Sequence, residues 1–104
     1  MKAAKAIGEW TEKDLLGHVR ELADAMGWHY YHTHDSRRSP EGYPDVVMVR
    51  DDRQVVAELK VRKRKPTAAQ NMWLDAYRQV GAEVYLWTED DLQEIADTLA
   101  GKVL

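Results

Sequence analysis

The sequence of 104 residues contains no cysteine and only three prolines. Without cysteine the chain can form no disulfide, no thiolate zinc site and no cysteine nucleophile, so oxygen or imidazole ligands must hold any metal. No apolar run approaches the roughly 18 residues of a membrane span, and the first residues lack the apolar centre of a signal peptide. We therefore expect a single cytoplasmic domain with no membrane partner.

Neither sign of charge predominates, because the net charge is only −3. This balance argues against nucleic acid as a partner, since phosphate binding normally leaves a basic footprint. The average hides an asymmetry: residues 36–65 contain nine Lys or Arg and five Asp or Glu, which gives +4 there and −7 elsewhere. That pattern is typical of one face for an anionic partner and an acidic back that leaves room for a protein partner, although a solvated charged surface gives the same count.

The spacing of apolar residues predicts the element order α-β-β-β-α-β-α. Two Asp residues between two β-branched runs are typical of a hairpin turn. The expected elements are a helix over 11–26, strands over 28–33, 44–50 and 54–61, a helix from 67 that ends before Gly81, a strand over 83–87 and a last helix that carries Leu92 to Leu99.

Capping residues predict where the helices begin. Thr11 with Asp14 and Thr67 with Gln70 have the spacing of capping boxes, and Thr88 with Asp91 is expected to cap the last helix. Inside the first helix, glycine at position 17 costs about 1 kcal/mol relative to alanine. Close packing of another element would justify that cost.

The hairpin also fixes which side chains face each other. If Asp51 and Asp52 form the turn, Asp45 lies directly opposite Glu58, and Lys60 follows two residues later on the same face. Opposed side chains have Cβ atoms roughly 4.5 to 5.5 Å apart, so two carboxylates there repel unless one is protonated or a cation joins them.

A divalent cation resolves this repulsion, and a set of carboxylate oxygens suits Mg²⁺ or Mn²⁺. Lys60 beside that ion would position or deprotonate a water, or neutralise charge on a phosphate. The plainer interpretation makes Asp45 a turn residue and Glu58 with Lys60 a solvated pair. The apolar residues around that pair weigh against it, because a charged pair in such a strand is costly.

Five short segments carry a family resemblance. They are Gly42-Tyr43-Pro44-Asp45, Ala57-Glu58-Leu59-Lys60, Thr67-Ala68-Ala69-Gln70, Trp73-Leu74 and Gly81 to Trp87. Together, in the element order given above, they resemble the VRR-NUC branch of the PD-(D/E)xK nucleases from about Thr11 to Ile95. The resemblance implies one restriction-endonuclease-like α/β domain over residues 1–104, built around a small mixed sheet, with residues 1–10 as an N-terminal tail.

The resemblance also implies roles for single residues. Asp45 and Glu58 would bind the metal together with the main-chain carbonyl of Leu59, and Lys60 would be the catalytic lysine. Glu12 would complete the metal site or orient a water, although the helix dipole alone also explains an acid there.

Gln70 matches a glutamine that supports the site and contacts the substrate backbone. It is equally well placed in the capping box, and we expect its side chain to serve only one of these purposes at a time. The residues expected to contact DNA are His32, Ser36, Arg37, Arg38, Arg62, Lys63, Arg64, Lys65 and Gln70.

Residues 62–65 and His32 each have another interpretation. Residues 62–65 form a solvated loop or a phosphate-binding strip. His32 and His34 share a strand face, but two imidazoles without a third ligand make a poor zinc site.

The implied activity is metal-dependent hydrolysis of DNA phosphodiesters by a homodimeric endonuclease selective for branched DNA such as Holliday junctions. A two-fold dimer would present two sites to two strands. The alternatives are a flap, nicking or end-processing nuclease, and a non-catalytic DNA-binding module. Loss of Asp45, Glu58 or Lys60 would mark the last of these, and all three residues are present.

Overall fold

A computed structural model describes residues 5–34 and 38–101 of the chain. The predicted order of helices and strands is confirmed, and one short 3₁₀ helix precedes it. The elements are η1 (Ile7–Glu9), α1 (Glu12–Ala25), β1 (His29–His32), β2 (Val46–Arg50), β3 (Arg53–Leu59), α2 (Ala68–Gln79), β4 (Glu83–Trp87) and α3 (Leu92–Leu99).

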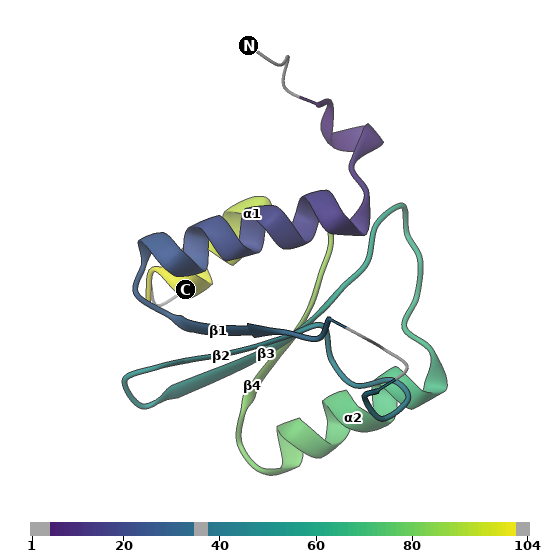
Figure 1. The fold of residues 1–104 in the computed structure, drawn as a ribbon, viewed down its shortest axis with the longest axis vertical. Coiled ribbons are helices and arrows are strands. Elements are labelled where there is room, and N and C mark those ends of the chain that lie inside the picture. The colour runs from purple at the N-terminus through teal and green to yellow at the C-terminus, as the bar shows by residue number, and fades with distance from the viewer. Residues whose placement is uncertain (1–4, 35–37, 102–104) are drawn as a thin grey trace.

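The four strands form one mixed sheet in the order β1-β2-β3-β4. The β1–β2 and β2–β3 pairs are antiparallel, and β3 and β4 are parallel. A parallel pair needs a crossover connection, which α2 provides. Figure 1 shows α1 and α3 on one face of this sheet and α2 on the other. The α/β fold with a small mixed sheet is therefore as predicted. No helix within the described residues is both long and apolar enough to cross a bilayer.

The register of the β2–β3 hairpin agrees with the two-residue turn expected from the sequence. Arg50 pairs with Arg53, and Val46 pairs with Ala57, so Asp45 comes one residue before the ladder and opposite Glu58. Both strands are shorter than predicted, because β2 begins at Val46 and β3 ends at Leu59. The chain turns away from the sheet after β3, where residues 62 and 63 have positive φ angles of 53° and 61°.

The main core lies between the sheet and the α1–α3 layer. Alternate residues of β3, among them Val55 and Ala57, pack there with Leu15 of α1 and Ile95 of α3, and all four side chains are fully buried. Each such side chain contributes roughly 1.5 to 3 kcal/mol relative to exposure. Since successive strand residues point to opposite faces, Glu58 is directed to the α2 side.

Both predicted capping boxes are present at α1 and α2. The cap expected from Thr88 is wrong: Asp91 is the N-cap residue of α3, and its carboxylate instead accepts hydrogen bonds from the backbone N–H and the hydroxyl of Thr88. Close packing does not explain Gly17 either, because a Cβ there would meet nothing within 4 Å.

Candidate active site

Glu58 is the centre of a polar cluster at the end of β3. Its side chain is only 1% exposed. The amide Nε2 of Gln70 donates to Glu58 Oε1 at 3.1 Å, and Lys60 Nζ lies 3.9 Å from the same oxygen. The second oxygen, Oε2, is buried and has no hydrogen-bond partner among the described residues. A buried carboxylate oxygen without a partner is costly, which is a mark of a site that binds a ligand.

The protonation of Glu58 reflects this environment. Burial raises the pKa of its carboxyl group well above the usual range, and the adjacent carboxylate of Asp45 raises that pKa further. The charge of Lys60 lowers the pKa, and the more distant Glu12 raises it. A cation at this position would remove the main electrostatic cost of ionising Glu58.

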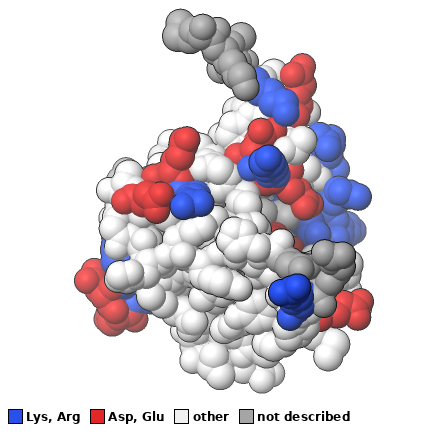
Figure 2. Space-filling view, in the orientation of Figure 1, with Lys and Arg blue, Asp and Glu red and all other residues white. Residues whose placement is uncertain are grey.

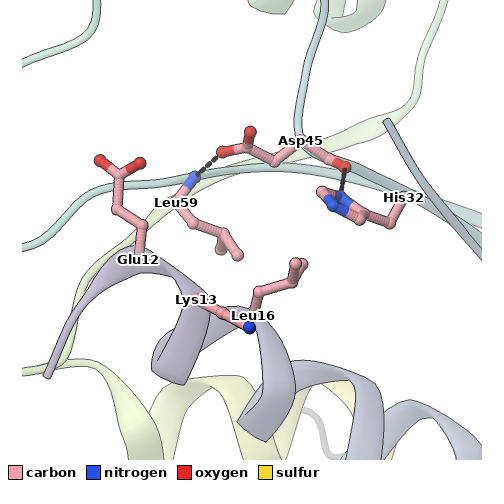
Figure 3. A pocket seen from close by; sticks show the side chains of 6 residues that line it. All are labelled: Glu12, Lys13, Leu16, His32, Asp45 and Leu59. Atoms are coloured by element: carbon pink, nitrogen blue, oxygen red, sulfur yellow. Dashed lines mark hydrogen bonds between the residues drawn. The ribbon is translucent and has the colours of Figure 1, made fainter. Parts of the chain in front are cut away.

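Asp45 is held by its own backbone and side chain. Its Oδ2 accepts a hydrogen bond from the backbone N–H of Leu59 at 2.9 Å. This side-chain bond takes the place of a backbone bond between β2 and β3. Its carbonyl accepts from the N–H of Thr33 and lies 3.1 Å from Nδ1 of His32, both at the end of β1. Figure 3 shows the Leu59 bond to the Asp45 carboxylate and the His32 contact with the Asp45 carbonyl. Asp45 is therefore fixed by β1 and β3 together.

The loop that carries Asp45 packs against the helix that carries Gln70. Gly42 has a φ of +80°, and a Cβ there would come within 2.4 Å of the Ala69 carbonyl carbon at the start of α2. The Tyr43 ring lies 5.0 Å from that of Trp73. Only glycine fits at position 42, so the Gly-Tyr-Pro-Asp segment is a packing motif as well as a source of the carboxylate.

Gln70 serves both purposes at once. Its amide oxygen accepts from the N–H of Thr67 at 2.8 Å, which completes the capping box, while its amide nitrogen donates to Glu58. The expectation that the side chain must choose between the two was wrong, because the two ends of a primary amide carry an acceptor and a donor separately. The cap thereby orients the amide toward Glu58.

A hollow of about 420 Å³ opens beside Asp45 on the α1 side. Glu12, in the first turn of α1, lines it together with Asp45 and Leu59, as Figure 3 shows. Lys13 lines it too, although the sequence analysis did not single out this residue. Its place directly after Glu12 at the start of a helix was the only available signal. A second hollow lies between Asp45 and Gln70, so Asp45 borders both.

The carboxyl groups of Asp45 and Glu58 fit a divalent cation. Asp45 and Glu58 approach each other, and one Glu58 oxygen lacks a partner within the part of the chain described. These are the conditions that a hard cation with oxygen ligands satisfies. No group of three His, Asp or Glu side chains close enough to hold a metal occurs in residues 5–34 and 38–101, so Glu12 stands apart from the pair.

The residues expected to contact DNA divide into three sets. Ser36 and Arg37 lie outside the described residues, and Arg38 follows them in an exposed turn. His32 contacts the Asp45 carbonyl and lines the hollow beside it. Residues 62–65 are exposed on the loop between β3 and α2. In Figure 2 blue atoms gather at the right, on the side where this loop runs in Figure 1.

Two contacts hold the start of this basic loop. The backbone N–H of Arg62 donates to Glu89 at 3.0 Å, and the Arg62 guanidinium donates to the carbonyl of Trp10 at 3.0 Å. Glu89 is buried, and sequence reasoning missed it because its partner is 27 residues away. The loop is thus anchored at Arg62 while residues 63–65 stay exposed.

Two solved structures share this architecture. A VRR_NUC domain matches over 83% of this chain and 94% of its own, with a TM-score of 0.69 and 18% sequence identity. The Holliday junction resolvase Hjc of Archaeoglobus fulgidus matches with a TM-score of 0.51 and 27% identity, over 74% of this chain and 63% of the resolvase.

The chain has the fold of a VRR_NUC domain. At 18% identity this likeness establishes the fold, which is the one that the sequence resemblance implied. No family model and no curated protein matches the sequence itself. The roles of the VRR_NUC-like site residues therefore rest on their geometry in this chain.

Proposed function

We propose that this chain is a Mg²⁺- or Mn²⁺-dependent endonuclease that hydrolyses phosphodiester bonds in DNA. One observation carries the proposal: the buried carboxylate of Glu58 lies beside Asp45, Lys60 and Gln70 and retains one oxygen without a partner among the described residues. The fold shared with a VRR_NUC domain and with a Holliday junction resolvase supports it.

Asp45 and Glu58 would hold the ion between them. In a strand the N–H and C=O of one residue are directed to the same side, so the Leu59 carbonyl is directed toward Asp45, which accepts from the Leu59 N–H. That carbonyl would be the third ligand, and Glu12 would act at longer range by orienting a water. When bound, the ion supplies positive charge to the phosphate oxygens and lowers the pKa of a water.

The remaining side chains would position the two carboxyl groups and stabilise charge on the phosphate. Gln70 fixes one oxygen of Glu58 and leaves the other for a ligand. Lys60 carries a positive charge close to Glu58, where it would stabilise charge that develops on the phosphate in the transition state. His32 holds the Asp45 backbone, so this residue would act on the carboxylate as well as on DNA.

Branched DNA such as a four-way junction is the proposed substrate, and a homodimer is the proposed assembly. The exposed Lys63, Arg64 and Lys65 would contact phosphates beside the site. Two copies related by a two-fold axis would cut two strands symmetrically. Sedimentation of the purified chain tests the assembly: a mass of one protomer at micromolar concentration would contradict the dimer.

The test of the activity is cleavage of end-labelled four-way junction, flap and linear duplex DNA with Mg²⁺, Mn²⁺ or EDTA. We expect metal-dependent, symmetric cuts in the junction by the wild type and none by Lys60→Ala. Preferred cutting of flaps or linear ends would replace the junction with the end-processing alternative. DNA binding by the wild type without cleavage of any substrate would leave only a binding module.

A further inference from the structure

The hollow beside Asp45 continues along α1 as a longer groove. A third hollow lies between α1 and the edge strand β1, and it shares three lining residues with the hollow beside Asp45, namely Lys13, Leu16 and His32. The two hollows therefore join into one groove that leads from Asp45 along the α1–β1 edge of the molecule. The other residues that line its far part are Gly17, Arg20, Tyr30, Tyr31 and His34.

One stripe of α1 forms a wall of this groove. Lys13, Leu16, Gly17 and Arg20 have the spacing i, i+3, i+4, i+7 and so share a helix face. The two cations are seven residues apart, which is about 10 Å along the helix axis. No carboxylate lines the far part of the groove within the described residues, in contrast to the part at Asp45. Two positive charges therefore lie along the wall that leads away from Asp45, and Arg20 also pairs with Asp24, 3.7 Å away.

Gly17 lies between the two cations and adds no side chain to this wall. It is helical and exposed, and an added Cβ would meet no atom of the described chain within 4 Å. Alanine would fit there and would favour the helix. The space above Gly17 is therefore open among the residues that the structure describes.

β1 forms the opposite wall. Because strand side chains alternate between the two faces of a sheet, Tyr30 and His32 lie on the α1 side and Tyr31 points to the other face. The Arg20 guanidinium lies 5.8 Å from the centre of the Tyr30 ring. A groove with positive charge along one wall binds a nucleic-acid strand through its phosphates.

We propose that the α1–β1 groove binds one DNA strand that leaves the catalytic carboxylates, with phosphates on Lys13 and Arg20. This inference rests on the proposed nuclease function and adds a strand path to it. The path is separate from residues 62–65 and lies at the sheet edge beside α1.

The test is equilibrium binding of a labelled four-way junction with a single-stranded arm, in EDTA, over a salt series. Arg78→Ala is the matched control for Arg20→Ala, because each arginine is exposed on a helix and paired with a nearby Asp. We expect the slope of log affinity against log salt to fall by about 0.7 for Lys13→Ala and for Arg20→Ala, and to stay unchanged for Arg78→Ala. Equal effects of Arg20→Ala and Arg78→Ala would overturn the proposal.

Position 17 gives a further readout. Gly17→Gln should fold with a melting temperature at or above that of the wild type and bind the same DNA at least tenfold more weakly. Wild-type affinity in Gly17→Gln would exclude a strand in the groove.

Cleavage by the wild type, measured in parallel with metal, separates this proposal from the proposed function. If the wild type cleaves the junction and the groove variants bind as tightly as it does, the strand path is wrong and the nuclease stands. If the wild type neither binds nor cleaves any DNA tested, both proposals fall.

Discussion

The two ends of the β2–β3 hairpin carry similar numbers of charged side chains and treat them in opposite ways. At the turn end, Arg50 and Arg53 are surrounded by partners. At the open end, Asp45, Glu58 and Lys60 are close together, and one Glu58 oxygen has no partner in the part of the chain described. The same two strands thus stabilise the fold at one end and hold a buried carboxyl group with an unpaired oxygen at the other.

The turn end works as a clamp between layers. Arg50 donates to the carbonyls of Met26 at 3.0 Å and Leu99 at 2.8 Å, so it joins the ends of α1 and α3. Arg53 makes two bonds to Glu83, at 2.7 and 2.8 Å, and one to the Thr98 carbonyl. Both guanidiniums lie over the Trp28 ring, at 4.7 and 5.0 Å from its centre. Cations near helix C-termini are favourable, which is why arginines suit this end.

This difference indicates which end of the hairpin carries the function. At the turn end, Arg50 and Arg53 find their partners within the chain. The open end keeps the buried carboxyl group of Glu58, whose pKa is raised by burial and by Asp45. Unfavourable charge in an otherwise well-packed sheet is expected at sites of chemistry. The comparison makes opposite predictions for substitutions at the two ends.

Removing one charge at the open end should have the largest effect, and it should fall on activity. Asp45→Asn retains an oxygen to accept from the Leu59 N–H and loses the negative charge. We expect metal-dependent DNA cleavage to drop at least about 100-fold, with the thermal midpoint little changed. Asp52→Asn, in the exposed hairpin turn, is the control and should cleave normally. Equal activity of the two variants would contradict a role of the open end in catalysis.

Gly42→Ala should damage both stability and activity, because its Cβ would collide with the start of α2. We expect a loss of roughly 1 to 3 kcal/mol in the free energy of unfolding and a lower cleavage rate, since the loop carries Asp45. Gly81 is the matched control: its φ is also positive, at +89°, but a Cβ there meets nothing within 4 Å. If Gly81→Ala costs as much as Gly42→Ala in urea unfolding, the close approach is not the cause.

Removing a guanidinium at the turn end should affect stability alone. Arg53→Met keeps an apolar stem and loses the bonds to Glu83 and Thr98. We expect a loss of about 2 kcal/mol in urea unfolding, while cleavage by the folded variant stays at the wild-type rate. A variant that is stable but inactive would show that the turn end also serves the chemistry.

Glu58 should make the metal-free protein less stable as pH rises. Because its folded pKa lies above the ordinary value of 4.5, the folded state binds more protons than the unfolded state above that pH. Stability should then fall by at most about 1.4 kcal/mol per pH unit until the folded group ionises. Glu58→Gln should flatten this dependence in urea unfolding with a chelator present. An unchanged slope in the variant would assign the effect to another group.

Much of this account could be predicted from the sequence because its rules are local. Strand side chains alternate with a period of two, so a two-residue turn was enough to set Asp45 opposite Glu58. Capping boxes likewise depend on residues three positions apart, and those at α1 and α2 are confirmed. The prediction at Thr88 was wrong because the same Asp91 carboxylate can close a turn before the helix instead of capping it.

The parts that could not be predicted depend on contacts between distant segments. Lys13 borders the site only because α1 packs beside the end of β1, and Glu89 holds Arg62 across 27 residues of sequence. The two bonds of Gln70 required knowing the distance from α2 to Glu58. Spacing along the chain carries no information on such distances, which are set by packing.

The most direct test of the central claim is a Mn²⁺ titration of the purified chain without DNA, followed by calorimetry. The account predicts that the wild type and Asp52→Asn bind Mn²⁺ with the same affinity, and that Asp45→Asn and Glu58→Gln lose at least tenfold in affinity. Undiminished binding in both Asp45→Asn and Glu58→Gln, or none in the wild type, would contradict a cation site at the open end of the hairpin.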